Sequence, residues 1–356
     1  MSHPHGDACG CVDVGRRVAV ASVQPQVSRV HVPRAEPRGR PRAAARDAAD
    51  TRIDVHYHIY PPRIFTQASS FADQIRSLPG VKDWEPSRAA DALDRDRVGT
   101  AVISFANPTL WSMDHEPQRR LARLCNDYFA QVVRDNPRRF GVFACLPPLN
   151  DVEGALGEIE YAFDTLKVVG VRVMTSYRDR HWLGDPMFAP VWDELDRRAA
   201  VVFVHPELAC FNRSAPLPSL ELPLDTARTG LSLWRAGAFA RWPRIRFIFC
   251  HAGGPLPMLT SRFNLIGRPG TDGEQIRDAD VLFRNAYFDT AQAASPSAMA
   301  ALLSLADPAR ILFGSDTPFA PAAAQASTLA ELVKDEALLR AIERDNALAL
   351  MPGLGR

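Results

Sequence analysis

The sequence predicts an α/β fold, a (β/α)8 TIM barrel, from three observations. Eight short runs rich in Val, Ile and Phe recur after residue 50. Longer segments with apolar residues at three- and four-residue steps separate these runs, which is the spacing of amphipathic helices. The pattern extends over about 300 residues, a length typical of a barrel built from eight strand–helix units.

Eight strands and five of the helices between them can be placed along the chain. The predicted strands are Arg52–His58, Thr100–Ala106, Phe140–Pro147, Val168–Ser176, Val201–Glu207, Arg244–Gly253, Ala286–Ala291 and Ile311–Pro318. The predicted helices are Glu116–Asn136, Asp151–Leu166, Pro186–Ala199, Asp225–Trp242 and Pro296–Ala306. The alternative architecture is an open doubly wound sheet, which usually carries a glycine-rich fingerprint after its first strand. The first strand here ends in HYHIYPP, which counts against a dinucleotide-binding domain.

Residues 1–50 differ in composition from the rest of the chain. They are rich in Arg, Pro, Ala and Gly and contain no aromatic residue. Because such a segment buries too little apolar surface to offset its ordering entropy, we expect a disordered extension ahead of one barrel domain over residues 51–356. The extension begins HPHGDACGC, a small His/Cys cluster that has the donors for zinc but is interpreted here as part of an unstructured tail.

The composition also bears on partners and location. With 42 basic and 41 acidic side chains, the net charge of +1 gives no sign of a nucleic-acid or membrane partner. Beyond residue 50 the cysteines are single and far apart, as is typical of reduced thiols. No apolar run approaches the roughly 20 residues of a membrane span, and none near the N-terminus has the ~7–15 residues of a secretory signal core. We therefore expect a cytoplasmic protein.

Histidines gather at the ends of the predicted strands. His56 and His58 close the first strand, His205 lies at the end of the fifth, and His251 at the end of the sixth. Asp316 stands at the end of the eighth strand in the same way. Since the active sites of barrels form at the carboxyl ends of the strands, we expect these side chains to meet there.

The spacing of the first two histidines indicates a metal site. Side chains two residues apart on a strand share a face, so His56 and His58 can ligate one ion. An isolated pair of this kind can also be a hydrogen-bonded core pair, but the further residues at the strand ends favour a metal. Imidazole nitrogens with a carboxylate oxygen suit Zn²⁺, and Mn²⁺ is a second candidate. The fourth strand lacks the lysine that commonly bridges two metals in barrel hydrolases, because Lys167 precedes it, so we expect a single ion.

Four motifs, in chain order, resemble the amidohydrolase superfamily: DVHYHIYPP, VVFVHP, RIRFIFCHAGG and ILFGSDTPF. The resemblance is to the group that includes aminocarboxymuconate semialdehyde decarboxylase and the aromatic-acid decarboxylases. Within that group, stretches such as PRRFGVFACLPPLNDVEGALGEIEYAFDTL and LGDPMFAPVWDELDRRAAVVFVHP are most similar to 6-methylsalicylate decarboxylases. The resemblance extends over roughly residues 51–350.

The resemblance implies a metal-dependent, non-oxidative decarboxylase of an aromatic or dienoic carboxylic acid, a carbon–carbon lyase. It implies that the metal ligands are His56, His58, His205 and Asp316. It further implies that His251 is the catalytic histidine beside the metal. Arg262 corresponds to an arginine that reaches the substrate carboxylate of a neighbouring subunit, which implies a homodimer.

Two chemistries are open to these residues. In a decarboxylase, a metal that holds the carboxylate and an adjacent oxygen orients the acid, and a proton donor then delivers a proton to carbon. Asp316 and His251 are both candidates for that transfer. In the alternative, the same ligands hydrolyse a lactone or an amide with His251 as general base. A binding module without catalysis is a third reading, but it would leave the strand-end ligands without a role.

Three aromatic residues on predicted strand-end loops are candidates for substrate binding. Trp111, Trp182 and Phe319 have side chains suited to stacking on an aromatic ring. Equally, they can cap the mouth of the barrel. The expected partner is therefore a small carboxylic acid.

Overall fold

The computed structural model describes residues 51–66, 85–105, 114–177, 181–206 and 218–354. The predicted N-terminal extension, residues 1–50, lies outside the described residues, and so does Trp111. Among the residues described, no helix combines the length and apolar character needed to cross a membrane.

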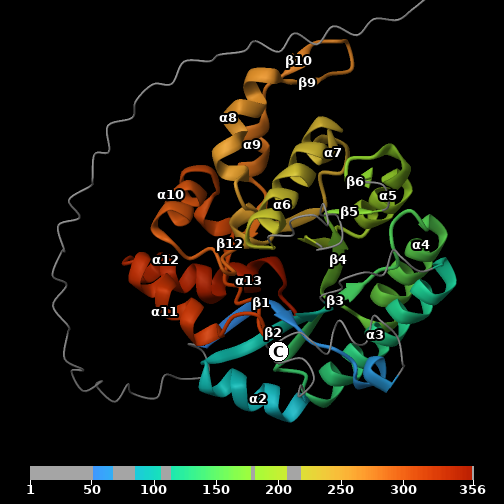
Figure 1. Cartoon of the computed structure of the whole chain (residues 1–356), viewed down its shortest axis with the longest axis vertical. Helices are drawn as coiled ribbons and strands as arrows, with labels where there is room; N and C mark the ends of the chain where they lie inside the picture. The colour runs from blue at the N-terminus through green and yellow to red at the C-terminus, as the bar shows by residue number, and fades with distance from the viewer. Residues whose placement is uncertain (1–50, 67–84, 106–113, 178–180, 207–217, 355–356) are drawn as a thin grey trace, which may run out of the picture. The chain divides into compact units, whose positions relative to one another are not determined.

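Eight strands form one parallel sheet in the order expected for a barrel. They are β1 (Arg52–His58), β2 (Val98–Ser104), β3 (Phe140–Cys145), β4 (Gly170–Met174), β7 (Val201–His205), β8 (Arg246–Phe249), β11 (Tyr287–Asp289) and β12 (Ile311–Leu312). Each strand pairs in parallel with the next one in this order. Helices surround the strands (Figure 1), which confirms the (β/α)8 barrel.

The helices and minor strands follow the barrel strands in alternation. The α-helices are α2 (Pro86–Arg95), α3 (His115–Asp135), α4 (Val152–Glu160), α5 (Ala189–Arg197), α6 (Pro218–Arg235), α7 (Ala238–Arg241), α8 (Leu256–Ile266), α9 (Ala279–Arg284), α10 (Pro296–Leu305), α11 (Ala322–Leu332), α12 (Glu336–Arg340) and α13 (Asn346–Leu350). Short 3-10 turns are η2 (Pro62–Thr66), η5 (Pro186–Phe188), η7 (His251–Gly253) and η8 (Pro308–Arg310), and π-helical turns are η4 (Tyr161–Leu166) and η9 (Ala341–Asp345). Two small hairpins are β5–β6 (Ser176–Tyr177, His181–Trp182) and β9–β10 (Arg268–Pro269, Gln275–Ile276).

Local sequence explains where several helices begin and end. The Asp151 side chain accepts a hydrogen bond from the Gly154 N–H and caps α4, and Ser295 caps α10 in the same manner ahead of a proline. The helix predicted at Asp225–Trp242 begins earlier, at Pro218, and is interrupted at Gly237. That glycine has a φ of +68°, which ends α6 and allows α7 to start in a new direction.

The first and last strands meet along a hydrogen-bonded seam, which closes the barrel. The Asp316 N–H donates to the His56 carbonyl at 2.9 Å, and the His58 N–H donates to the Thr317 carbonyl at 2.7 Å. Tyr57 and Thr317 form an isolated parallel bridge at the same level. The seam therefore places the histidine pair of β1 directly beside the segment that follows β12.

A glycine makes this close approach possible. A Cβ atom on Gly314 would lie 2.9 Å from the Cβ of His56 and 3.1 Å from the Cβ of Asp289. Any larger residue at position 314 would have to push one of these side chains away. The glycine of the GSD sequence after β12 is therefore required by its close contact with His56 of β1 and Asp289 of β11.

Regular pairing in the sixth and eighth strands is shorter than predicted. β8 ends at Phe249 and β12 at Leu312, whereas the patterns predicted strands to Gly253 and Pro318. The reason is backbone conformation, since His251 has a φ of +54° and Asp316 a φ of +66°. The predicted catalytic histidine, His251, and the predicted metal ligand Asp316 therefore lie on turns that follow these strands.

Aromatic packing fills the barrel beneath the strand ends. Phe143 and Phe203 stack with their ring centroids 5.2 Å apart, and Phe203 also meets the His56 ring edge-on at 4.9 Å. Both phenylalanines are fully buried, and burial of each such side chain contributes about 2–3 kcal/mol to folding. This packed layer is the floor on which the polar residues of the strand ends rest.

Candidate active site

The five residues predicted at the strand ends come together in the structure. The ligand atoms of His56, His205, His251 and Asp316 all lie within 4.8 Å of one another. His58 belongs to the same cluster, because its Nε2 lies 3.0 Å from the Nε2 of His56 and 3.1 Å from the Oδ1 of Asp316. The strand ends therefore bring these five side chains into one cluster.

The donor atoms of this cluster fit a divalent metal ion. His205 Nε2 and Asp316 Oδ1 are buried and have no hydrogen-bond partner within the described part of the chain. Buried polar atoms without partners are costly, and a metal ion would satisfy both. Imidazole nitrogens with one carboxylate oxygen form a donor set that Zn²⁺ and Mn²⁺ both accept.

Hydrogen bonds behind the imidazoles present their Nε2 atoms to the cluster. The Nδ1–H of His205 donates to the Pro206 carbonyl at 2.7 Å, which leaves its Nε2 with a free lone pair. His58 Nδ1 is hydrogen-bonded to the Ser104 hydroxyl at 3.1 Å. These partners fix the ring orientations that a metal ligand needs.

Asp289, at the end of β11, supports two of the histidines and was missed in the sequence. Its Oδ2 accepts a hydrogen bond from His56 Nδ1 at 2.8 Å, and its Oδ1 accepts from the backbone N–H of His251 at 2.8 Å. The side chain is fully buried. Its position in the sequence could have identified it. Asp289 lies near the carboxyl end of the seventh predicted strand, as the other site residues lie near the ends of theirs.

Asp54 connects β1, which carries His56, to the segment after β12, which carries Asp316. Its Oδ1 accepts hydrogen bonds from the His56 N–H at 3.0 Å and from the Ser315 N–H at 3.1 Å. Burial raises the pKa of this carboxyl to about 7. The register of β1 is irregular between Asp54 and Tyr57, and bulges of this kind often re-aim side chains beside active sites.

Arg172 places a buried positive charge next to the cluster and was also missed. It extends from β4, and its guanidinium lies 3.2 Å from His205 Nδ1. Burial and then the charge of Arg172 hold the pKa of His205 well below its ordinary value. His205 is therefore neutral at physiological pH, which is the state in which imidazole binds metals.

The charges within the cluster shift pKa values in opposite directions. Burial alone would lower the pKa of His56, but the carboxylates of Asp289 and Asp316 raise it to about 10. Burial lowers the pKa of His58 to about 4. Burial by itself would raise the pKa of Asp316, yet the charge of His56 and a hydrogen bond from His251 hold it well below its usual range. Asp316 is therefore an anion at neutral pH, and a cation that binds here has to displace a proton from His56.

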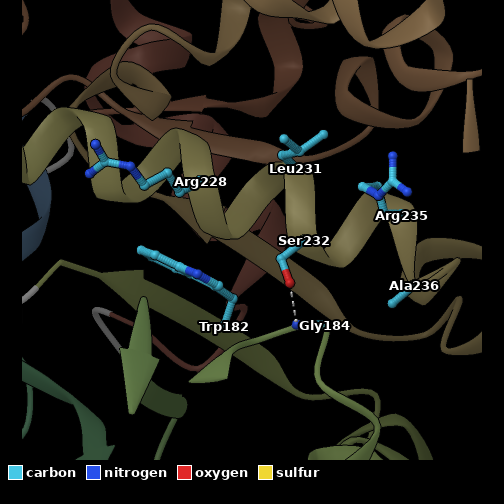
Figure 2. Close-up of a pocket in the computed structure, with 7 residues that line it drawn as sticks. All are labelled: Trp182, Gly184, Arg228, Leu231, Ser232, Arg235 and Ala236. Carbon is cyan, nitrogen blue, oxygen red and sulfur yellow. Dashed lines mark hydrogen bonds between the residues drawn. The ribbon is translucent and has the colours of Figure 1, made fainter. Parts of the chain in front are cut away.

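The predicted substrate-binding residues lie in different places. The Phe319 ring is 5.8 Å from the His58 ring and 37% exposed, so it lies beside the cluster and is partly open to solvent. Arg262 is exposed on α8. Trp182 lies on β6 and lines a separate pocket of about 450 Å³ with residues of α6, and none of the five cluster residues lines that pocket. In Figure 2 the indole lies beneath the helix that carries Arg228 and Ser232, and the Ser232 hydroxyl accepts a hydrogen bond from the Gly184 N–H at 3.1 Å.

The chain belongs to the amidohydrolase family, whose model matches residues 53–352. It is 36% identical over 329 residues to 6-methylsalicylic acid decarboxylase acuB of Aspergillus aculeatus, covering 86% of this chain and 97% of the relative. It is also 36% identical over 278 residues to 6-methylsalicylic acid decarboxylase of Penicillium expansum, covering 76% of this chain and 86% of the relative. The protein is therefore a carboxy-lyase, a decarboxylase of the amidohydrolase superfamily.

Solved structures agree with this fold. A crystal structure described as amidohydrolase II superposes with a TM-score of 0.75 at 26% identity, covering 85% of this chain and all of that one. Dihydroxybenzoic acid decarboxylase from Polaromonas, solved with bound manganese and 2-nitroresorcinol, superposes with a TM-score of 0.72 at 22% identity, covering 85% of this chain and 97% of that one. Both likenesses support the barrel architecture.

The Asp289→Asn variant is expected to bind a divalent metal ion about 10- to 100-fold more weakly, because an amide replaces the carboxylate that accepts from His56 and from the His251 backbone. Competition with a chelator of known affinity measures the change. Asp280→Asn is the matched control, since Asp280 is an exposed α9 residue that bonds only to Asn264 among the contacts described. Equal metal affinity in the two variants would contradict the role assigned to Asp289.

Proposed function

We propose that the protein is a metal-dependent decarboxylase of an aromatic carboxylic acid, and that 6-methylsalicylate or a related hydroxybenzoate is its substrate. The observation that carries this proposal is the buried cluster of histidines and Asp316 at the strand ends. The chain's similarity to two 6-methylsalicylic acid decarboxylases supports the choice of substrate class.

We infer that one divalent ion, Zn²⁺ or Mn²⁺, is held by His56, His58, His205 and Asp316. Such an ion would act as a Lewis acid that orients the acid and withdraws electron density from it. The protein contributes a fixed donor set and a dry floor of stacked phenylalanines beneath it. The partly exposed Phe319 ring lies beside His58, where it would stack on an aromatic substrate.

Decarboxylation exchanges a carboxylate for a hydrogen on carbon, so the site must deliver a proton. His251 Nε2 lies 3.4 Å from Asp316 Oδ2, and this contact orients the imidazole within the cluster. His251 is therefore assigned as the group that protonates carbon, with Asp316 as its charge partner. The backbone N–H of His251 is held by Asp289, which fixes the position of the ring's attachment.

The product of the reaction tests the proposal. The metal-loaded protein is incubated with 6-methylsalicylate, 2,6-dihydroxybenzoate and benzoate, and with a panel of lactones and amides. The expected result is CO₂ release, with the corresponding phenol as product, from at least one hydroxybenzoate. Ring opening of lactones without CO₂ release from any acid would replace the decarboxylase with the hydrolase alternative.

We also propose that two copies of the chain associate through α8 and that Arg262 serves the neighbouring subunit's site. Met258, Leu265 and Ile266 on α8 are 68%, 78% and 61% exposed, and Val281 on α9 is 57% exposed. Figure 1 shows α8 and α9 side by side, and the two helices pack against each other. Clustered apolar side chains of this kind are typical of protein–protein contacts.

A complementation assay tests this arrangement. Arg262→Ala and His251→Ala proteins are each expected to be inactive alone. After mixing and subunit exchange, half the dimers carry one intact site, so activity returns to about a quarter of the wild-type level. Failure of the mixture to regain activity, together with a monomeric mass in sedimentation, would remove the shared site.

A further inference from the structure

The two oxygens of Asp316 have different surroundings. Oδ1 lies 3.2 Å from His56 Nε2 and 3.1 Å from His58 Nε2, and it has no hydrogen-bond partner among the described residues. Oδ2 lies 3.4 Å from His251 Nε2, and it also accepts a short hydrogen bond from the side-chain amide of Gln292. One oxygen thus faces the donor atoms of the histidines, and the other is held by an amide.

Gln292 reaches the carboxylate from an unusual backbone position. It follows β11 by three residues and has a φ of +50°, a left-handed conformation that costs a non-glycine residue about 1 kcal/mol or more. Its backbone N–H donates to the side-chain oxygen of Gln325 on α11 at 3.1 Å. The residue is exposed, yet its amide nitrogen contacts a buried carboxylate. Since an ionised carboxylate only accepts hydrogen bonds, the NH₂ group must be the end that meets Asp316.

The surrounding loop does not depend on this amide for its shape. The Ala291 N–H donates to Asp289 at 3.0 Å, and the Ala293 N–H donates to the Thr290 carbonyl at 3.1 Å. Ser295 then caps α10. The loop is therefore fixed on both sides of Gln292, and the contact between its amide and Asp316 serves the carboxylate.

We propose that Gln292 is a positioning residue that restricts Asp316 to ligating the ion through Oδ1 alone. By occupying Oδ2, the amide keeps the carboxylate from rotating and holds that oxygen toward His251. The inference rests on the proposed function, because it requires that an ion binds the cluster. Neutral partners of this kind, hydrogen-bonded to a metal ligand, typically change metal affinity or activity by 10- to 100-fold when they are removed.

The test replaces the amide while keeping the length of the side chain. Gln292→Met removes the donor, and Gln292→Ala is a second variant in case the thioether finds a contact of its own. Gln325→Met is the matched control, because it removes the acceptor of the Gln292 backbone N–H and leaves the amide in place. Zn²⁺ and Mn²⁺ affinities are measured by competition with a chelator, and the melting temperature of each metal-free protein shows that it is folded.

We expect both Gln292 variants to bind the ion about tenfold more weakly than wild type, and Gln325→Met to stay within about threefold. With saturating metal, kcat of Gln292→Met should fall about tenfold while KM changes less than about threefold, because the amide touches the ligand rather than the substrate. Wild-type affinity in both Gln292 variants would overturn the inference, whatever happens to kcat. A wild-type protein that binds neither ion would instead remove the proposed function, so the two failures are distinguishable.

Discussion

Replacement of both His56 and His58 by alanine is expected to abolish metal binding and, with it, decarboxylation. These imidazoles present two nitrogen donors only 3.0 Å apart on the floor of the cluster, and no other pair of predicted ligands comes from a single strand. Their loss leaves a site with too few donors to hold an ion against water. Elemental analysis should find about one ion per wild-type chain and less than about a tenth of that in the variant.

The control for this variant is His181→Ala. His181 lies on β6, outside the cluster, and its Nδ1 is hydrogen-bonded to Asp185 at 2.7 Å. It is expected to keep full metal content and full CO₂ release. Because the double variant removes two buried side chains, circular dichroism must show that it is folded before its metal content is interpreted. A folded double variant that still carries one ion per chain would sink the ligand assignment.

His251→Ala is expected to keep its metal ion and lose turnover by about 10²- to 10⁴-fold, the range typical of a lost proton donor. The imidazole of His251 contacts Asp316, while its backbone is anchored independently by Asp289. The variant should therefore retain the shape of the turn. His251→Asn is a useful companion, since asparagine accepts the left-handed backbone that residue 251 adopts at φ +54°.

Metal content decides between two roles for His251. Its ring nitrogen lies within 4.8 Å of the other donor atoms, close enough to serve as a ligand itself. If His251→Ala loses the ion along with its activity, the residue is a ligand. If the ion stays and only kcat falls, it acts on the substrate, as proposed. The comparison uses the same elemental analysis as the β1 double variant.

The fold and the location of the candidate site residues were predictable because their signals are local. An apolar run that ends on a polar residue, as at His205, predicts a strand. It also predicts which side chain lies at the carboxyl end of that strand, where barrel active sites form. His56 and His58 follow the same logic, since two-residue spacing on a strand fixes a common face. Parallel barrels bring all strand ends to one rim, so residues far apart in sequence can be placed together without knowing any contact between them.

The residues missed act through contacts that no local pattern records. Asp289 and Gln292 act through their contacts with residues of other segments. The contact of Gln292 with Asp316 depends on a left-handed backbone conformation at Gln292 that the sequence does not predict. Arg172 stands in an otherwise apolar strand, so its charge was visible in the sequence. Its proximity to His205 was not visible there. The strands β8 and β12 were predicted too long for a different reason, because left-handed turns at His251 and Asp316 follow them. The role of Trp111 stays a prediction, as does that of Trp182.

The seam between β1 and the segment after β12 bears on how the protein is made. Asp316 leaves the ribosome about 260 residues after His56, so a nascent chain that has not reached Asp316 lacks one of the proposed ligands. An ion held by both would also act as a clasp that joins the beginning of the barrel to its end. Cross-links that close so long a loop restrict the unfolded chain most strongly in the chain-entropy view. Metal binding at the catalytic centre would then stabilise the closed barrel. The supply of metal would govern the lifetime of the folded protein as well as its turnover.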